Sequence, residues 1–290
     1  MTQSTSAVAE SGTFSIGGDL PVYRLGYGVM QLPGPGVWGP PRDHDEAIRV
    51  LRRVVELGVN LIDTADSYGP EVSENLIAEA LHPYPERLVI ATKGGLRRTG
   101  PSQWPRDARP ERLKECCEGS LRRLKLDRIE LYQLHSPDNR VPLEESMGAL
   151  KELQDEGKIR HVGVSNVSAE QLERARAVVE VVSVQNRYNL EDRRSDDLLD
   201  ACEAANIGFI PWFPLATGRL AEPGGPLDRI ARAHEATPAQ IALAWLLARS
   251  PVMLPIPGTS SIAHFEENLA AAEVDLSPDE VAEIGSYARG

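Results

Sequence analysis

Short aliphatic segments alternate with longer amphipathic segments from about residue 24 to the end of the chain. The short segments have the length and β-branched content of buried strands, and the long ones repeat apolar residues every three or four positions, as helices do. Strands are expected at residues 24–30, 60–64, 88–93, 129–135, 161–165, 181–187, 207–213 and 253–257. Helices are expected at residues 43–57, 73–81, 109–124, 142–156, 168–179, 194–205, 238–248 and 261–272. This alternation predicts a parallel sheet covered by helices.

Eight strand–helix repeats favour a closed (β/α)8 barrel, the TIM barrel, over an open doubly wound sheet. No G-x-G-x-x-G motif follows a strand and opens a helix, which counts against a Rossmann nucleotide site. Residues 12–22 contain a Gly-Gly-Asp turn and predict a β-hairpin that covers the bottom of the barrel. A last helix is expected at 277–287. Residues 1–290 are therefore expected to form one domain, with residues 1–11 as a frayed tail.

Composition narrows the choice of partners and compartment. The 43 acidic and 31 basic residues give a net charge of −12, whereas nucleic acids and anionic membranes attract basic surfaces. Neither partner is expected. Cys116, Cys117 and Cys202 are too few for a disulfide framework, and no stretch approaches the roughly 18 apolar residues of a membrane span. Without a secretory leader either, the chain is expected to be cytoplasmic. The sequence predicts no oligomeric state.

Four polar residues stand at the ends of three successive predicted strands. Asp63 and Tyr68 follow the second strand, Lys93 ends the third and His135 ends the fourth. Alone, each has an ordinary explanation: a turn residue, a lysine that reaches solvent, or a hydrogen-bonded structural histidine. Catalytic residues of a (β/α)8 barrel lie at the C-terminal ends of its strands. All four together therefore predict an active site at the barrel mouth.

These residue types suit proton transfer to a carbonyl group. A tyrosine hydroxyl can act as a general acid, and a neighbouring Lys93 ammonium is expected to lower the pKa of Tyr68. Asp63 is expected to pair with Lys93, and His135 to hydrogen-bond the carbonyl oxygen of the substrate. The H-x-H pattern of metal-dependent barrel hydrolases is absent, so no metal is expected.

The four residues resemble the catalytic set of the aldo-keto reductase superfamily, and the resemblance extends from about residue 12 to the end of the chain. Asp63 and Tyr68 match the D-x-x-x-x-Y element, Lys93 the strand-three lysine and His135 the strand-four histidine. The resemblance implies a soluble enzyme that reduces an aldehyde or ketone with NAD(P)H. It also implies that Tyr68 is the general acid, that Lys93 and Asp63 set its pKa, and that His135 orients the carbonyl.

The same resemblance implies a cofactor site. Ser165, Asn166 and Gln185 match the residues that hold the nicotinamide carboxamide. Trp212 stands where the family places an aromatic ring under the nicotinamide, with core packing as the alternative. The remaining matches lie in a pyrophosphate loop and an adenosine-phosphate segment: Gly218, Arg219, Gly258, Thr259, Ser260, Ser261, His264, Glu267 and Asn268.

Two positions depart from the better-known members, which carry lysine where Gly258 stands and arginine where His264 stands. Both of those side chains contact the 2′-phosphate of NADPH. The hydroxyl-rich segment still begins a helix, whose N-terminus favours an anion. We expect NADPH to be the cofactor, with a weakened grip on its 2′-phosphate and with NADH remaining possible.

Residues 34–42 resemble a bacterial branch of pyridoxal reductase-like enzymes. We expect Trp38, Tyr68, Trp104 and Trp212 to wall a pocket for flat aromatic or small aldehydes. Four arginines of the following loop either attract an anionic group or form a solvated face: Arg97, Arg98, Arg106 and Arg109.

Two other functions remain open at this point. The first alternative to an enzyme is a nucleotide-binding regulatory module with little turnover. Measurable turnover that is lost in Tyr68→Phe would indicate the enzyme. A third hypothesis is an aldolase-like barrel that forms a Schiff base on Lys93. That chemistry needs an unpaired, desolvated lysine, which the nearby Asp63 opposes.

Overall fold

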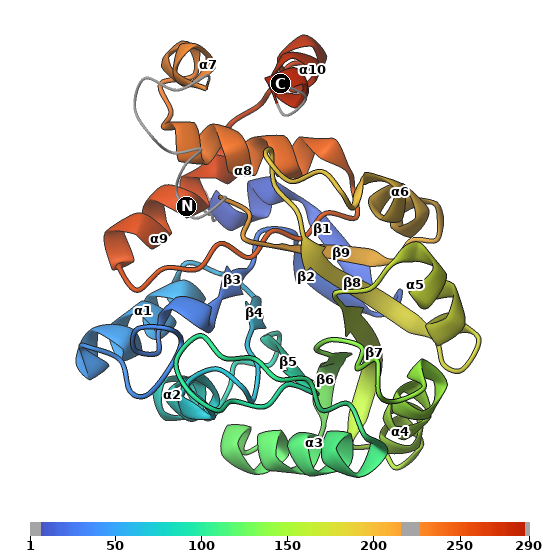
Figure 1. Cartoon of the computed structure of the whole chain (residues 1–290). Coiled ribbons are helices and arrows are strands. Elements are labelled where there is room, and N and C mark those ends of the chain that lie inside the picture. Colours follow the sequence, from blue (N-terminus) through green and yellow to red (C-terminus); the bar gives the residue numbers. More distant parts are fainter. Residues whose placement is uncertain (1–6, 216–226, 288–290) are drawn as a thin grey trace.

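The computed structural model describes residues 7–215 and 227–287. At its centre lies a curled sheet of parallel strands in chain order, surrounded by helices (Figure 1). The strands described are β3 (Tyr27–Gly28), β4 (Leu61–Asp63), β5 (Val89–Gly94), β6 (Ile129–Leu134), β7 (Ile159–Ser165), β8 (Val181–Arg187) and β9 (Gly208–Trp212). Each strand pairs with the next, and the buried side chains of the sheet belong to two hydrophobic clusters. The predicted (β/α)8 architecture is confirmed.

The helices outside the sheet follow the predicted segments closely. They are α1 (His44–Glu56), α2 (Val72–Leu81), α3 (Pro110–Leu124), α4 (Leu143–Asp155), α5 (Ala169–Arg176), α6 (Asp196–Ala204), α8 (Pro238–Arg249), α9 (Ile262–Leu269) and α10 (Pro278–Ser286). A short helix, α7 (Asp228–Ala233), was not expected from the pattern. Two 3-10 turns, η2 (Val29–Gln31) and η4 (Ala270–Glu273), follow β3 and α9.

The eighth predicted strand, 253–257, is not a regular strand. Met253 forms a single bridge with Phe209, and the amide of Leu254 donates to the carbonyl of Phe209 at 2.8 Å. On the other side, the amide of Gly26 donates to the carbonyl of Pro255 at 2.9 Å. Proline has no N–H, so Pro255 and Pro257 cannot continue a hydrogen-bonded ladder. This segment therefore closes the barrel between β9 and β3 with few backbone hydrogen bonds.

The N-terminal hairpin is present, as β1 (Thr13–Ile16) and β2 (Leu20–Tyr23) pair antiparallel. The Asp19 carboxylate at its turn contacts Arg160 and His161 near the start of β7, which places the hairpin at the N-terminal end of the barrel. The expectation of a frayed tail is wrong for residues 7–11, since they form a 3-10 helix, η1 (Ala7–Ser11), with Val8 fully buried. Residues 1–6 lie outside the described residues.

Cys116, Cys117 and Cys202 are all free and buried. None of the helices described is long and apolar enough to cross a membrane. Over the same residues, no group of three or more His, Cys, Asp or Glu side chains is arranged to hold a metal ion.

Candidate active site

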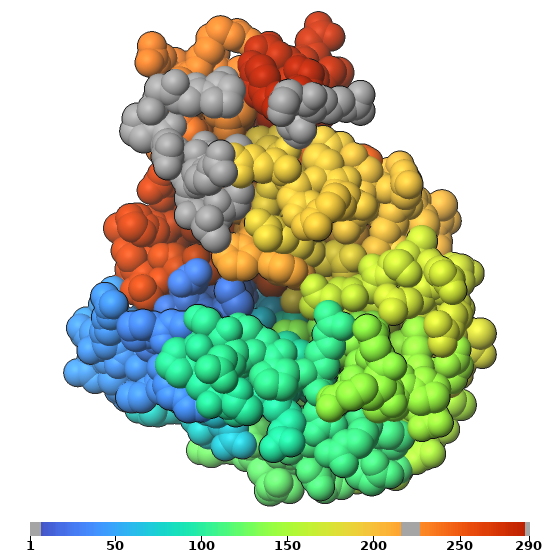
Figure 2. All heavy atoms as spheres, in the orientation of Figure 1, coloured from blue at the N-terminus to red at the C-terminus, as the bar shows by residue number. Residues whose placement is uncertain are grey.

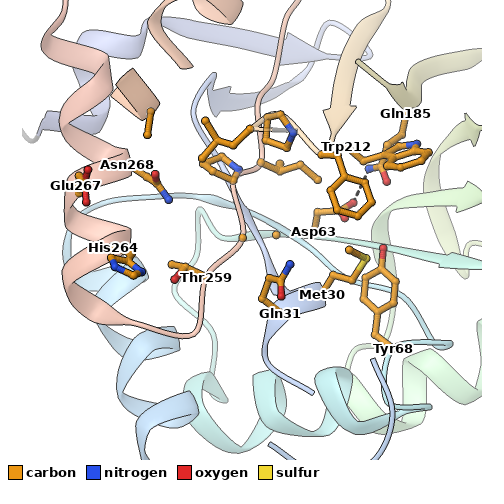
Figure 3. Close-up of a pocket in the computed structure, with 18 residues that line it drawn as sticks. Met30, Gln31, Asp63, Tyr68, Gln185, Trp212, Thr259, His264, Glu267 and Asn268 are labelled. Atoms are coloured by element: carbon orange, nitrogen blue, oxygen red, sulfur yellow. Dashed lines mark hydrogen bonds between the residues drawn. The ribbon is translucent and has the colours of Figure 1, made fainter. Parts of the chain in front are cut away.

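The four predicted catalytic residues meet at the C-terminal end of the barrel. Asp63 ends β4, Lys93 lies in β5, His135 directly follows β6, and Tyr68 lies in the loop after β4. All four side chains are buried. Figure 3 shows Asp63 and Tyr68 along the same pocket, with the hydroxyl end of Tyr68 directed into it. On this face of the molecule, a hollow opens between the blue N-terminal segments and the orange C-terminal ones (Figure 2).

Lys93 and Asp63 form a buried ion pair. The Nζ atom of Lys93 lies 2.7 Å from Oδ2 of Asp63 and donates to the carbonyl of Thr64, also at 2.7 Å. Burial lowers the pKa of Lys93, but the contacts with Asp63 and Tyr68 together more than offset this, so the pKa lies above its ordinary value. The lysine is therefore a held cation. A Schiff base needs a neutral, free amine, and this geometry disfavours that alternative.

The other oxygen of Asp63 is held by two glutamines. Nε2 of Gln185 donates to Oδ1 of Asp63 at 2.8 Å, and Nε2 of Gln133 donates to the same atom at 3.4 Å. Gln133 was not predicted as a site residue, although its position two residues before His135 places it on the same face of β6. Side-chain amides thus fix the orientation of the carboxylate that holds Lys93.

Lys93 acts on the pKa of Tyr68 in the expected direction, but the pKa of Tyr68 nevertheless lies above its ordinary value. Burial raises the pKa of Tyr68, and the charge of Lys93 opposes this only in part. The Lys93 Nζ atom lies 5.2 Å from the centre of the Tyr68 ring. The phenol is consequently protonated near neutral pH, which is the form a proton donor needs. Without the charge of Lys93, burial would raise the pKa of Tyr68 further, so Lys93 makes loss of the phenol proton easier.

His135 is a neutral imidazole in this structure. Burial, followed by the charges of Lys93 and Arg98, lowers the pKa of His135 well below its ordinary range. Its ring packs edge-to-face against Tyr68 with 5.9 Å between ring centres, and its Nδ1 atom lies 3.4 Å from Oγ of Ser67. When Nδ1 accepts from the Ser67 hydroxyl, Nε2 carries the proton and can donate.

An elongated cavity of about 460 Å³ begins beside Asp63 and Tyr68 and runs toward α9 (Figure 3). It is also lined by some residues that were not predicted, among them Met30 and Phe213. Trp212 is one of the lining residues, so the core-packing alternative for it is wrong. The other predicted cofactor residues that line the cavity are Gln185, Gly258, Thr259, His264, Glu267 and Asn268.

Several predicted cofactor residues do not line this cavity. Nδ2 of Asn166 donates to the carbonyl of His135 at 2.9 Å, and Oδ1 accepts from Nε1 of Trp212 at 3.2 Å. Asn166 therefore positions the tryptophan. Ser165 is buried beside it, within hydrogen-bond distance of its amide. Ser260 borders a neighbouring pocket, and Ser261 caps α9 by accepting from the His264 amide. The predicted residues Gly218 and Arg219 lie outside the described residues.

The backbone at Gly258 leaves no room for a side chain. A Cβ atom on Gly258 would lie 2.6 Å from the carbonyl oxygen of Gly28, and one on Gly28 would lie 2.7 Å from the carbonyl oxygen of Ile256. Real Cβ atoms do not approach backbone oxygens so closely. The lysine that better-known members carry at this position therefore does not fit the present backbone.

Trp38 and Trp104 lie around Arg98, close to Tyr68. Trp104 packs edge-to-face on Tyr68, with 6.2 Å between ring centres. The Arg98 guanidinium lies 3.6 Å from the Trp104 ring centre and 5.6 Å from that of Trp38. Arg109 is instead occupied by an ion pair with Asp107 at 2.7 Å. The four arginines therefore do not form one uniform face.

A family model, described as the Aldo/keto reductase family, matches residues 24–289. The chain belongs to the aldo/keto reductase family. It is an NAD(P)H-dependent oxidoreductase. An uncharacterized oxidoreductase of Schizosaccharomyces pombe is 47% identical over 285 residues, which cover 98% of this chain and 92% of the relative. Pyridoxine 4-dehydrogenase of Escherichia coli is 44% identical over 286 residues, which cover 96% of this chain and 99% of the relative.

Solved aldo/keto reductase structures agree with this assignment. The glycerol dehydrogenase of Gluconobacter oxydans superimposes with a TM-score of 0.85 at 29% identity, covering 96% of both chains. An aldo/keto reductase of Klebsiella pneumoniae, solved in complex with NADP and acetate, gives a TM-score of 0.79 at 28% identity. That match covers 95% of this chain and 94% of the other.

Proposed function

We propose that this aldo/keto reductase uses NADPH to reduce an aldehyde or ketone to the alcohol, with Tyr68 as the proton donor. The observation that carries the proposal is the buried Lys93–Asp63 ion pair beside Tyr68, whose hydroxyl opens into a long cavity. A pocket lined by a neutral phenol, with a fixed cation next to it, suits protonation of an oxygen that gains negative charge. The complex of the Klebsiella relative with NADP supports the choice of nucleotide.

The residues along the cavity fit a dinucleotide. Trp212 and Gln185 lie at the end near Tyr68 and offer a flat ring and an amide to the nicotinamide. Thr259, His264 and Asn268 lie at the other end and offer polar groups to the adenosine phosphate. Gly28 and Gly258 also line the cavity, and their close approach leaves no room for a side chain at either position. When bound, NADPH supplies the hydride for the carbonyl carbon.

The protein's own part in the reaction is to bind and protonate the carbonyl oxygen. The Nε2–H group of His135 donates a hydrogen bond to that oxygen, and the Tyr68 hydroxyl donates a second bond and then its proton. Lys93 stabilises the phenolate that remains, because its ammonium is held beside the ring. Asp63 keeps Lys93 charged and in place, and Gln185 and Gln133 keep Asp63 in place.

Flat aromatic aldehydes are the proposed substrates, with pyridoxal as the first to test. The Escherichia coli relative named pyridoxine 4-dehydrogenase is 44% identical over nearly its whole length. Trp38 and Trp104 offer ring surfaces beside Tyr68 on which such a substrate can stack. The three free, buried cysteines suit a reducing compartment, so we propose that the reaction takes place in the cytoplasm.

The test is to mix the purified protein with NADPH or NADH and pyridoxal, and to follow the absorbance of the reduced nicotinamide. Tyr68→Phe is expected to lower kcat by about 10²–10⁴-fold, the usual contribution of a general acid, with nucleotide affinity unchanged. Tyr84→Phe is the matched control, because the Tyr84 hydroxyl donates to the carbonyl of Leu124 and Tyr84 is not among the residues that line the cavity. Tight nucleotide binding with no turnover of any aldehyde would contradict the proposal and favour a regulatory nucleotide-binding module.

A further inference from the structure

Arg98 lies in the loop between β5 and α3, near the catalytic residues but outside the set described so far. Its guanidinium is part-buried, and each of its acceptors among the described residues is a backbone carbonyl. The acceptors are Gln103 for Nε at 2.9 Å, Val37 and Ser67 for Nη1 at 2.7 and 2.9 Å, and Gly36 and Gly100 for Nη2 at 2.8 and 3.3 Å. These carbonyls belong to three separate loops. Arg98 therefore joins the loop after β3, the loop after β4 and its own loop.

The number of hydrogen bonds decides what Arg98 can do. A guanidinium carries five N–H donors, and five backbone carbonyls accept from it here. No donor remains for an anionic group on a substrate. The earlier alternatives for this arginine, an anion site or a solvated face, are both inconsistent with these contacts.

The same guanidinium also lies over the rings of two tryptophans, Trp38 and Trp104. Its central carbon lies 3.6 Å from the Trp104 ring centre and 5.6 Å from the Trp38 ring centre. Trp104 in turn packs edge-to-face on Tyr68. Arg98 thus connects the aromatic wall to the proton donor in two ways, through ring stacking and through the carbonyl of Ser67, the residue before Tyr68.

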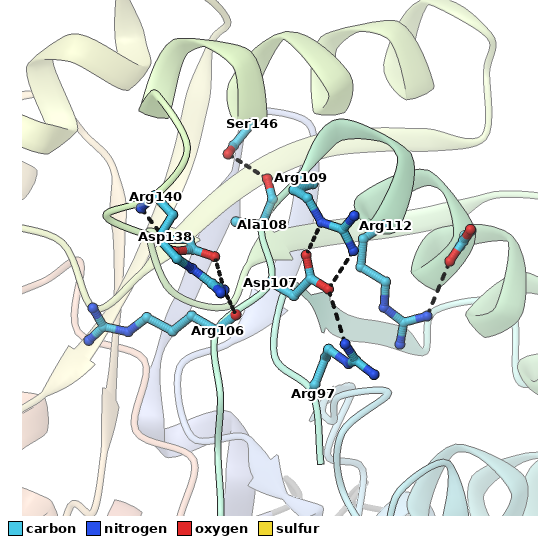
Figure 4. A network of polar contacts seen from close by, with 10 residues as sticks. Arg97, Arg106, Asp107, Ala108, Arg109, Arg112, Asp138, Arg140 and Ser146 are labelled. Atoms are coloured by element: carbon cyan, nitrogen blue, oxygen red, sulfur yellow. Dashed lines mark hydrogen bonds and ion pairs between the residues drawn. The ribbon is translucent and has the colours of Figure 1, made fainter. Parts of the chain in front are cut away.

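The base of this loop is held independently of Arg98. The amide of Asp107 donates to the carbonyl of Gly95 at 2.9 Å, and the amide of Arg97 donates to the carbonyl of Pro105 at 2.7 Å. Figure 4 shows the Asp107 carboxylate bound by Arg109. The Nη1 atom of Arg97 lies 3.9 Å from the same carboxylate. In the same network, the Arg140 guanidinium binds Asp138 and the carbonyl of Arg106. Loss of Arg98 therefore frees the tip of the loop without unfolding its base.

We propose that Arg98 is a positioning residue, which fixes the Trp38–Trp104 wall over Tyr68 and so determines the preference of the enzyme for flat aromatic carbonyl substrates. This inference rests on the proposed carbonyl reduction. A stacked substrate needs a wall at a fixed distance, whereas a small aliphatic aldehyde needs only Tyr68 and His135. Lysine cannot replace Arg98, because its ammonium has three donors and no flat face.

The kinetic test compares Arg98→Lys and Arg98→Met with the wild type on pyridoxal and on propanal. Both variants are expected to raise the KM for pyridoxal by about tenfold or more, since several hydrogen bonds that hold the wall are lost. The kcat for propanal and the Kd for NADPH are expected to stay within about threefold, a difference below 1 kcal/mol. Arg97→Met is the matched control, because Arg97 is exposed and lies in the same loop. An unchanged ratio of pyridoxal to propanal turnover, or full rescue by lysine, would overturn the proposal.

A second measurement does not depend on turnover. Hydrogen–deuterium exchange is measured on peptides that cover residues 34–39 and 98–104, in protein without nucleotide or substrate. Exchange in both peptides is expected to rise in Arg98→Lys and Arg98→Met and to stay unchanged in Arg97→Met. If exchange rises while no protein reduces any aldehyde, the proposed function fails and the positioning role stands. Unchanged exchange in both Arg98 variants refutes the positioning role itself.

Discussion

Replacing Asp66 with asparagine is expected to remove a decline in the free energy of unfolding that occurs as pH rises. Asp66 lies between Asp63 and Tyr68 in sequence, but its buried carboxyl group is close to Glu74 of α2 and Cys116 of α3. Among the described residues, its Oδ1 atom has no hydrogen-bond partner. Burial, and then the Glu74 carboxylate, raise the pKa of Asp66 to about 7.

The sign of the effect follows from proton binding. The pKa of Asp66 is raised in the folded state, so as pH rises from about 4 to about 7 the unfolded chain loses its proton first. The contribution of Asp66 to the free energy of unfolding therefore falls across this window and is constant above it. A shift from 3.8 to about 7 is roughly 3 pKa units, which corresponds to about 4 kcal/mol at 1.36 kcal/mol per unit. Asparagine has nearly the same volume and no proton to lose, so the variant lacks this decline.

The assay is urea unfolding of the wild type and of Asp66→Asn at several pH values between 4 and 8. The variant is expected to gain stability relative to the wild type as pH rises, with more than half of the gain between pH 5 and pH 8. Asp45→Asn is the control, because the Asp45 side chain is 86% exposed. Parallel stability curves for the wild type and Asp66→Asn over the whole range would refute the reasoning.

Three further predictions, two for substitutions and one for a pH profile, test other parts of the site. Asp63→Asn leaves the buried Lys93 charge without its partner, so urea unfolding should show a loss of about 3–5 kcal/mol, and a loss below 1 kcal/mol contradicts a buried pair. Gly258→Ala forces a Cβ atom toward the Gly28 carbonyl, so both the melting temperature and the affinity for NADPH should fall; an unchanged affinity contradicts the close approach. The pKa of His135 is lowered well below 6.5, so kcat/KM should show no acidic limb near pH 6.5, and such a limb means that the imidazole is not held neutral.

The hydrophobic pattern predicts most of this fold because strong periodicity survives in each helix and most strands. It fails where local chemistry interrupts it. Residues 253–257 have the apolar content of a strand, yet Pro255 and Pro257 cannot donate to a ladder. The helix α7 has six residues, too few for the pattern to repeat. Val8 is flanked by the small residues Ala7 and Ala9 in an otherwise polar segment, and only its contacts in the folded chain bury it.

The positions of the catalytic candidates could be predicted because each stands at a strand end, and strand ends meet at the barrel mouth. The pKa shifts of these residues could not be predicted from the sequence. The net rise in the pKa of Tyr68 comes from burial, which depends on the loops that fold over it. The role of Arg98 depends on carbonyls more than 60 residues away, at Gly36 and Val37. No local pattern records such contacts.

The junction between β9 and β3 has a consequence for the apoprotein. Gly28, Ile256 and Gly258 lie on this junction and also line the proposed nucleotide cavity, so a bound dinucleotide touches both sides of a part of the wall with few backbone hydrogen bonds. A bound nucleotide would then connect the two sides of the barrel wall at this junction. At 100 times its Kd, any ligand that binds only the folded state adds about 2.7 kcal/mol of stability. Here the bound nucleotide stabilises the junction between β9 and β3, so the hydrogen bonds of the Gly26 and Leu254 amides should open less often in the holoenzyme. Local opening of the barrel wall at this junction and release of the nucleotide are therefore expected to be thermodynamically coupled.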